Sequence, residues 1–452
     1  MEELETFIMK KFGLAFAFMG VLGTGSFAQK IEFEEYDLPN GMHVILHQDH
    51  SAPVVVTSVM YHVGAKDEQP DRTGFAHFFE HLLFEGTENI ERGEWFKIVS
   101  SNGGKNNANT TDDRTYYYEV FPSNNLQLGL WMESERLMHP IINQIGVDTQ
   151  NEVVKEEKRL RIDNQPYGNI LKAVKQNMFK NHPYRWTTIG EMEHLDAAKL
   201  DEFKAFFKKF YVPNNAVLVV AGDFEKEQAR KWISDYFSSI PKGTVTPKKQ
   251  YEEAPITKEF HASWEDPNVQ IPMLLTAYRT PSMKTRDARV LDMISTILSD
   301  GKSSRLYKRL VDTEKKALDV GAFNYSQEDY GTYFIYALPV GDTSLESLSK
   351  VFSEEIKKLQ TDLISEREYE KLLNKFENQF VNANSNVEGI AHSLANYYLL
   401  YKDVNLINNE LDIYRSITRE EIRNIAKQYL NDNQRLVLEY GPEKDKSQNS
   451  TK

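Results

Sequence analysis

The 452-residue sequence contains no cysteine, so disulfide bonds and thiol chemistry are excluded from its stability and its mechanism. Basic residues are also in deficit, because 54 lysines and arginines stand against 67 aspartates and glutamates, for a formal net charge of -13. Proteins that bind nucleic acid carry a basic patch, and we therefore expect no nucleic-acid partner. We interpret the acidity as a property of a soluble surface.

Long hydrophobic runs are missing too, apart from one at residues 12–22, which is too short for a comfortable transmembrane helix. This run follows Met9-Lys10-Lys11 and is followed by Ser26-Phe27-Ala28, an order typical of a signal peptide. We therefore expect a signal peptide at 1–28, with Met9 as the candidate start, and cleavage after Ala28. The mature chain is then expected to be exported to the periplasm without membrane insertion.

The chain is too long for one hydrophobic core, and an internal repeat divides it. The pattern Tyr211-x-x-x-Asn215-x-x-Leu218-Val219 returns as Tyr429-x-x-x-Asn433-x-x-Leu436-Val437, each time after an amphipathic helical pattern. We expect a first domain at 29–240, a polar linker at 241–257, a second domain at 258–442 and a disordered tail at 443–452.

Local patterns predict strands and helices in both parts. Asn40-Gly41 between two strand-like segments predicts a β-hairpin. Hydrophobic alternation and β-branched residues predict further strands at 54–63, 107–111, 115–121 and 217–222. Helical periodicity predicts helices at 126–138, 148–161 and 199–210.

One short segment, His77-Phe78-Phe79-Glu80-His81, carries the chemistry. On a helix the two histidines and Glu80 share one side, while the opposite side is apolar: Phe75, Phe78, Phe79, Leu82 and Leu83. Imidazoles at positions i and i+4 can bind one metal ion, and the carboxylate between them points toward the same space. The order H-x-x-E-H is the inverted zincin pattern, with the glutamate as base. An ordinary polar helix face is the alternative.

A catalytic zinc keeps three protein ligands and one open position, so a third ligand is expected on another element. In the helical segment 151–160 we expect Val153, Val154 and Leu160 to face inward. Glu157 falls near the centre of that face and Glu156 on its flank. An inward carboxylate among valines is costly unless it is paired or bound to metal. Glu157 is therefore the candidate ligand, and a partly exposed salt bridge to Lys158 or Arg161 is the alternative.

These segments resemble the M16 family of zinc metallopeptidases, which includes pitrilysin, insulin-degrading enzyme and mitochondrial processing peptidase. The resemblance also covers Pro39-Asn40-Gly41-Met42, residues 103–110 and His182-Pro183-Tyr184, and it spans nearly the whole mature chain. It implies an α+β fold of two similar domains, each a mainly antiparallel sheet packed with helices, which form one half of a clamshell. The family's distal glutamate matches Glu157, whereas Glu156 is one position short.

The resemblance implies a zinc endopeptidase with one Zn²⁺ per chain, held by His77, His81 and Glu157, with Glu80 as catalytic base. Asn107 and Ala108 resemble the family's active-site edge strand, to which a substrate peptide adds as an extra strand. Asn107 could equally be a turn residue beside Gly103-Gly104. Gln150 stands where many relatives have a second glutamate that assists the metal site.

The resemblance also implies a partner. Relatives that cleave peptides alone carry an arginine and, shortly after it, a tyrosine in the later domain, where this chain has Val311 and Leu318. Neither side chain can donate a hydrogen bond. We therefore expect the zinc-bearing subunit of a heterodimer, whose homologous partner lacks the zinc motif and supplies the pair. Two alternatives stay open: a self-sufficient homodimeric peptidase and a non-catalytic assembly subunit.

Overall fold

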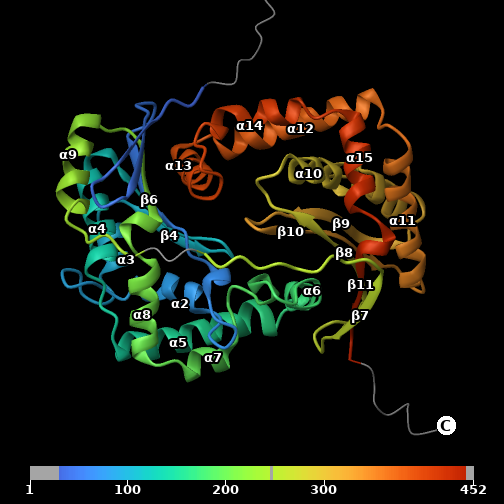
Figure 1. Ribbon diagram of the computed structural model, residues 1–452, viewed down its shortest axis with the longest axis horizontal. Helices are drawn as coiled ribbons and strands as arrows, with labels where there is room; N and C mark the ends of the chain where they lie inside the picture. Colours follow the sequence, from blue (N-terminus) through green and yellow to red (C-terminus); the bar gives the residue numbers. More distant parts are fainter. Residues whose placement is uncertain (1–29, 245–247, 444–452) are drawn as a thin grey trace, which may run out of the picture. The chain divides into compact units, whose positions relative to one another are not determined.

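The computed structural model describes residues 30–244 and 248–443, in which helices surround two separate β-sheets (Figure 1). The fold is therefore α+β with two sheet-and-helix domains, as predicted. The predicted signal peptide and all but the first residue of the predicted tail lie outside the described residues. No helix within 30–244 and 248–443 has the length and apolar character needed to cross a membrane.

The first sheet has six strands, and only the pairing of β2 with β6 is parallel. The predicted hairpin joins β1 to β2, and Gly41 provides its turn with a φ of 83°. The order across the sheet is β1 (Glu34–Asp37), β2 (His43–Gln48), β6 (Ala216–Gly222), β3 (Val54–Tyr61), β5 (Thr115–Pro122) and β4 (Lys105–Thr110). Strand β4 therefore lies at one edge.

Except for the helix at Ile170–Met178, the helices of the first domain lie on one side of this sheet and build a large hydrophobic core with it. Their amphipathic patterns predicted three of them: the predictions 126–138 and 199–210 agree within one residue, whereas the helix predicted at 148–161 lies at 144–158. They are α2 (Phe75–Leu82), α3 (Trp95–Ser101), α4 (Leu126–Met138), α5 (Gln144–Lys158), α6 (Ile170–Met178), α7 (Met192–Ala197), α8 (Leu200–Phe210) and α9 (Lys226–Phe237).

The second domain repeats this topology. Its sheet has the order β7 (Phe260–Glu265), β11 (Arg435–Gly441), β8 (Met273–Pro281), β10 (Tyr330–Pro339) and β9 (Ala317–Tyr325). Strand β11 pairs in parallel with β7 and antiparallel with β8, as β6 does with β2 and β3. Its helices are α10 (Arg286–Ser299), α11 (Leu345–Thr361), α12 (Glu366–Ala383), α13 (Val387–Asn396), α14 (Leu406–Arg415) and α15 (Arg419–Tyr429). The short internal repeat therefore marks the same strand in both domains.

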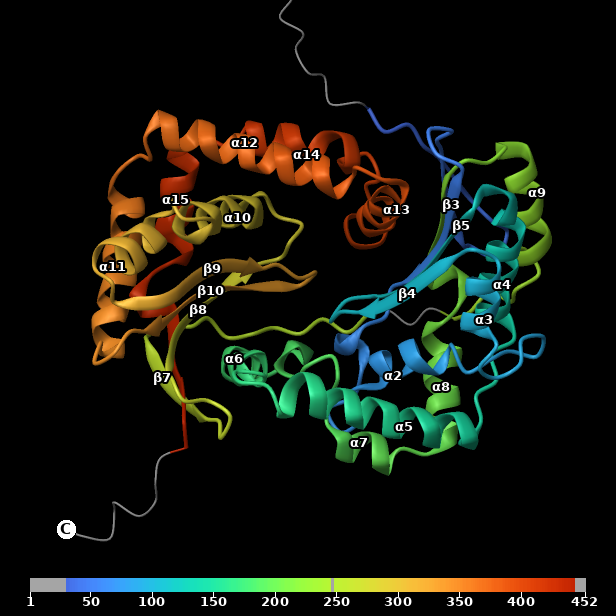
Figure 2. The same cartoon turned by 180° about the vertical axis from the view of Figure 1, so that it is seen from behind.

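The two domains exchange one helix each. Helix α6 of the first domain packs on the second sheet, where Val174 and Met178 join a core with Leu275 and Leu438. Helix α13 of the second domain packs on the face of the first sheet that its own helices leave uncovered, near β3 and β6 (Figure 2). The ring of His392 on α13 meets the ring of Tyr116 on β5.

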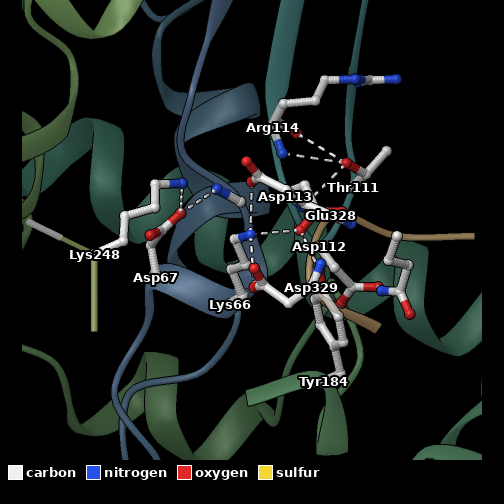
Figure 3. Close-up of polar contacts among 12 residues, drawn as sticks. Lys66, Asp67, Thr111, Asp112, Asp113, Arg114, Tyr184, Lys248, Glu328 and Asp329 are labelled. Atoms are coloured by element: carbon white, nitrogen blue, oxygen red, sulfur yellow. Dashed lines mark hydrogen bonds and ion pairs between the residues drawn. The ribbon is translucent and has the colours of Figure 1, made fainter. Parts of the chain in front are cut away.

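A buried ionic cluster links the β9–β10 turn to the first domain (Figure 3). At its centre the Lys66 ammonium lies 2.9 Å from Asp113, 2.7 Å from Glu328 and 2.9 Å from Asp329. Next to it Asp112 binds Lys175 at 2.6 Å. Buried charges are stable when they are paired in this way. The cluster therefore holds the β9–β10 turn against the residues that directly follow strand β4.

Candidate metal centre

Helix α2 carries the H-x-x-E-H segment and is held at its start by Glu68. The Glu68 carboxylate accepts hydrogen bonds from the backbone N–H groups of Gly74 and Ala76, both at 2.8 Å. Gly74 has a φ of 92°, which suits glycine. The apolar side of the helix is buried as predicted, and Phe78 and Phe79 pack against Phe203 of α8. The opposite side is thereby turned toward α5.

The structure brings His77, His81 and Glu157 together. One potential ligand atom from each lies within 4.8 Å of the others. The Nε2 atoms of His77 and His81 lie 3.4 Å and 3.1 Å from Glu157 Oε2. A third residue far away in sequence has thus joined the two histidines, which is the arrangement that a three-ligand metal site needs.

Glu157 reaches this place by a different helix face from the one predicted. Val154 is fully buried, but Val153 is 43% exposed and Leu160 is 55% exposed, so the prediction that these two face inward is wrong. The regular helix ends at Lys158, and a π-helical turn (Arg159–Asp163) follows, which rotates Leu160 away from its ideal position. The buried line of α5 is Val147 and Val154, two turns apart.

The predicted alternative for Glu157 is also present in part. Arg161 Nη1 lies 2.6 Å from Glu157 Oε1, while Lys158 pairs with Asp163 instead. Each carboxylate oxygen therefore has its own surroundings. Oε1 faces the exposed arginine, and Oε2 faces the two imidazoles.

The residues fit a divalent metal ion. Glu157 Oε2 is buried, and no hydrogen bond reaches it from the described residues, although both Nε2 atoms are close. Burial and the neighbouring His81 ring lower the pKa of His77 to about 4, so this imidazole is neutral at pH 7. The short contact with His81 lowers the pKa of Glu157, which favours the carboxylate. Neutral imidazoles and a carboxylate are the protonation states that bind Zn²⁺.

Glu80 lies beside this group and is held by a residue that sequence reasoning missed. Thr110 Oγ1, at the end of β4, donates a hydrogen bond of 2.6 Å to Glu80 Oε2. Burial raises the pKa of Glu80, although the Thr110 hydrogen bond opposes the shift. A carboxylate with a raised pKa suits a general base. Only the pairing of β4 in the sheet puts Thr110 here, so no local sequence signal could reveal it.

Two further predicted residues lie on β4. Asn107 and Ala108 are in the middle of this edge strand, and Asn107 Oδ1 accepts from the Ala108 N–H. Asn107 is therefore a strand residue and does not form the glycine turn. The amide of Gln150 donates to Glu85, and no hydrogen bond among the described residues links it to His77, His81 or Glu157.

Val311 and Leu318, which stand where other relatives have an arginine and a tyrosine, differ in their surroundings. Val311 is half-buried against the second core, whereas Leu318 on β9 is 54% exposed. Strand β9 lies at one edge of the second sheet.

Fold and site together define a two-domain α+β protein in which two histidines and a glutamate are grouped as candidate metal ligands. Two family descriptions match this chain: "Insulinase (Peptidase family M16)" over residues 43–191, and "Peptidase M16 inactive domain" over residues 197–376. Together they span most of both sheets and the H-x-x-E-H helix. The chain belongs to peptidase family M16.

Similar proteins extend over nearly the whole chain. A zinc protease, PqqE, from Helicobacter pylori is 27% identical over 440 residues, which cover 95% of this chain and 98% of the relative. The crystal structure of a protease from the same organism has a TM-score of 0.86 at 26% identity and covers 91% of this chain and 100% of that one. The periplasmic protease PqqL from Escherichia coli has a TM-score of 0.77 at 18% identity, a likeness of fold. The match covers 92% of this chain but 48% of PqqL.

Proposed function

We propose that this chain is a zinc endopeptidase. The observation that carries the proposal is the meeting of His77, His81 and Glu157, with ligand atoms within 4.8 Å of one another. One Zn²⁺ per chain would be held by these three side chains. When bound there, zinc would lower the pKa of a water molecule and polarise a peptide carbonyl.

The chain's own residues then account for proton transfer. Glu80 would accept the proton of the attacking water and later deliver it to the amine that leaves. Thr110 fixes one oxygen of the Glu80 carboxylate, which leaves the other oxygen for the water. The burial that raises the pKa of Glu80 also makes the protonated form easier to reach during this cycle.

The substrate would bind as an additional strand along β4. The outer edge of β4 has no strand partner among the described residues, so its backbone groups can pair with an extended peptide. Backbone pairing beside Asn107 and Ala108 gives affinity with little dependence on sequence. Peptides and unfolded segments, which can become extended, are therefore the proposed substrates.

We further propose that a homologous subunit without the zinc motif completes the enzyme. Val311 and Leu318 cannot donate a hydrogen bond to the developing oxyanion, so another molecule would have to supply the donors of these two positions. The match to about half of PqqL supports this idea, because that single chain has room for two such units. The partner would supply the arginine and tyrosine and would close a chamber around the peptide.

Export is the remaining proposal. The predicted signal peptide at 1–28 supports it, as does the similar fold of PqqL, a periplasmic protease. The mature chain would then act on peptides in the periplasm.

The test is a peptidase assay on the purified mature chain, with its zinc content known, using an unstructured fluorogenic peptide. The assay is repeated after adding the homologous subunit that lacks H-x-x-E-H. We expect activity only in the mixture, and its loss on chelation of zinc. Loss of one oxyanion donor alone costs about 10²- to 10³-fold in rate, so the lone chain should be nearly inactive. Full activity of the lone chain would support the homodimeric alternative, and no activity in either case would support the non-catalytic one.

A further inference from the structure

Arg114 is a buried cation without an anionic partner among residues 30–244 and 248–443. Its residue is only 8% exposed, and no carboxylate among the described residues lies within ion-pair distance of its guanidinium. The group donates to the backbone oxygen of Asn109 at 3.0 Å and to the Asn109 side chain. Buried charges are normally paired, so this arrangement is costly in the free protein.

The nearest acidic groups are already occupied. Asp113 is bound by Lys66 and Tyr184, and Glu80 by Thr110. Figure 3 shows the Arg114 side chain pointing away from the cluster around Lys66, so its guanidinium does not share those carboxylates. Burial, which the more distant acidic groups do not offset, lowers the pKa of Arg114 to about 10. It therefore remains charged at pH 7.

The neighbours on α13 do not neutralise Arg114 either. Glu388 binds Lys105 and the Tyr118 hydroxyl. Burial, together with the charge of Arg114, lowers the pKa of His392 to about 4, so this ring is neutral at pH 7. Among the described residues near β4 and α13, Arg114 is thus the only cation without a counter-ion.

The position of Arg114 relative to β4 suggests what its partner is. Side chains alternate between the two faces of a strand. Thr110 points to the face of Glu80, so the neighbouring Asn109 side chain, which Arg114 contacts, points to the other face. A peptide added along β4 would also present alternate side chains to these two faces. Some of them would pass Arg114 on the face opposite the catalytic base.

We propose that Arg114 binds a carboxylate of the substrate peptide beside strand β4. The group is an aspartate or glutamate side chain or the terminal carboxylate of a short peptide. Arginine is suited to this task because its planar guanidinium can donate two parallel hydrogen bonds to a carboxylate. The inference rests on the proposed function, and it gives a backbone-binding site a preference for acidic peptides.

Binding can be measured without turnover in the Glu80→Gln chain. The probes are fluorescent unstructured peptides that carry one glutamate at successive positions, with a matched series that carries glutamine. A third series with an amidated end separates the terminal carboxylate from a side chain. Because a carboxylate accepts stronger, charge-assisted hydrogen bonds from a guanidinium than a neutral amide does, we expect one glutamate position, or the free end, to bind at least about tenfold tighter than its neutral match.

Variants identify the residue. In Arg114→Gln the tenfold preference should disappear while the glutamine peptides bind as before, and Arg114→Lys should keep part of it. Lys97→Gln removes an exposed charge on α3 and should change neither affinity. If the Glu80→Gln chain, which keeps Arg114, binds the glutamate and glutamine peptides equally, the inference is overturned, even if Arg114→Gln does not fold. A preference that survives in Arg114→Gln would overturn it as well. Failure of the proposed function would appear separately, as absence of peptide cleavage by the unsubstituted enzyme.

Discussion

At the scale of single residues, the two carboxylates of the site have different surroundings, which shift their pKa values in opposite directions. Glu80 and Glu157 are both partly enclosed carboxylates close to the same histidines. Burial raises the pKa of Glu80, whereas the contact with His81 lowers the pKa of Glu157. Opposite shifts in neighbouring groups are typical of a division between base and ligand. The proposed roles follow from this difference.

The base assignment predicts the behaviour of Glu80→Gln. The amide keeps the shape of the side chain but cannot accept a proton, so turnover by the active enzyme should fall by at least about 10²-fold. Zinc content and peptide binding should be unchanged, because Glu80 is not a proposed ligand. Turnover within a few-fold of the unsubstituted enzyme would remove Glu80 from the mechanism.

At the scale of elements, a buried arginine holds the C-terminal end of helix α2 by a hydrogen bond. Arg136 of α4 is fully buried and lies between Glu119 and Glu133, at 3.0 Å and 3.1 Å. Its guanidinium also donates to the carbonyl of Leu83, at the end of α2, and packs over the ring of Trp95 at 4.0 Å. One side chain thus joins the sheet, α4 and the C-terminal end of α2.

Removing this arginine should therefore destabilise the first domain. Arg136→Met leaves two buried carboxylates without their partner, a change that typically costs about 3–5 kcal/mol. The free energy of unfolding is measured by urea denaturation, with Lys231→Gln as control. That substitution breaks an exposed pair with Asp235 and should cost less than about 1 kcal/mol. An equal effect of both changes would contradict the structural role of Arg136.

The elements also show what sequence could reveal. The alternation of phenylalanine and ligand-type residues predicted α2 and its two faces, because both depend on local periodicity. The same reasoning was wrong for Leu160, since it assumed one regular helix where a π-helical turn begins. It was also wrong for Val153, which lies on the exposed side of the regular helix, because packing against distant segments decides which side of α5 is buried. It also missed Glu68, Thr110 and Arg136, whose contacts arise from sheet pairing and packing between distant segments. The metal role of the three grouped residues stays a prediction.

At the scale of the whole molecule, helix exchange and the ionic cluster connect the two domains. Glu328 and Asp329 of the second domain meet Lys66 of the first. Burial alone would raise the pKa of Asp329, but His182 and Lys66 outweigh it and lower the pKa to about 2. His62 and Lys66 similarly outweigh burial at Glu328 and lower its pKa.

These shifts predict acid sensitivity. A carboxyl group whose pKa is lower in the folded state stabilises the protein above its unfolded pKa of about 4, and the stabilisation is lost as the pH falls toward 2. The free energy of unfolding should therefore decrease as the pH falls from about 5 to about 3. In Lys66→Met this decrease should be smaller and the stability at pH 7 lower. A parallel pH dependence in both proteins would exclude the cluster as its source.

The central claim is that His77, His81 and Glu157 together hold one zinc ion, and metal content tests it most directly. Zinc is measured by plasma emission after dialysis of the purified mature chain, of His77→Ala, of Glu157→Gln and of the control Glu156→Gln. Glu156 is half-exposed and pairs with Arg159, so its substitution should leave the site intact. We predict one zinc per chain in the unsubstituted protein and in Glu156→Gln, and loss of stoichiometric zinc in the other two. Full zinc content in both His77→Ala and Glu157→Gln would contradict the account.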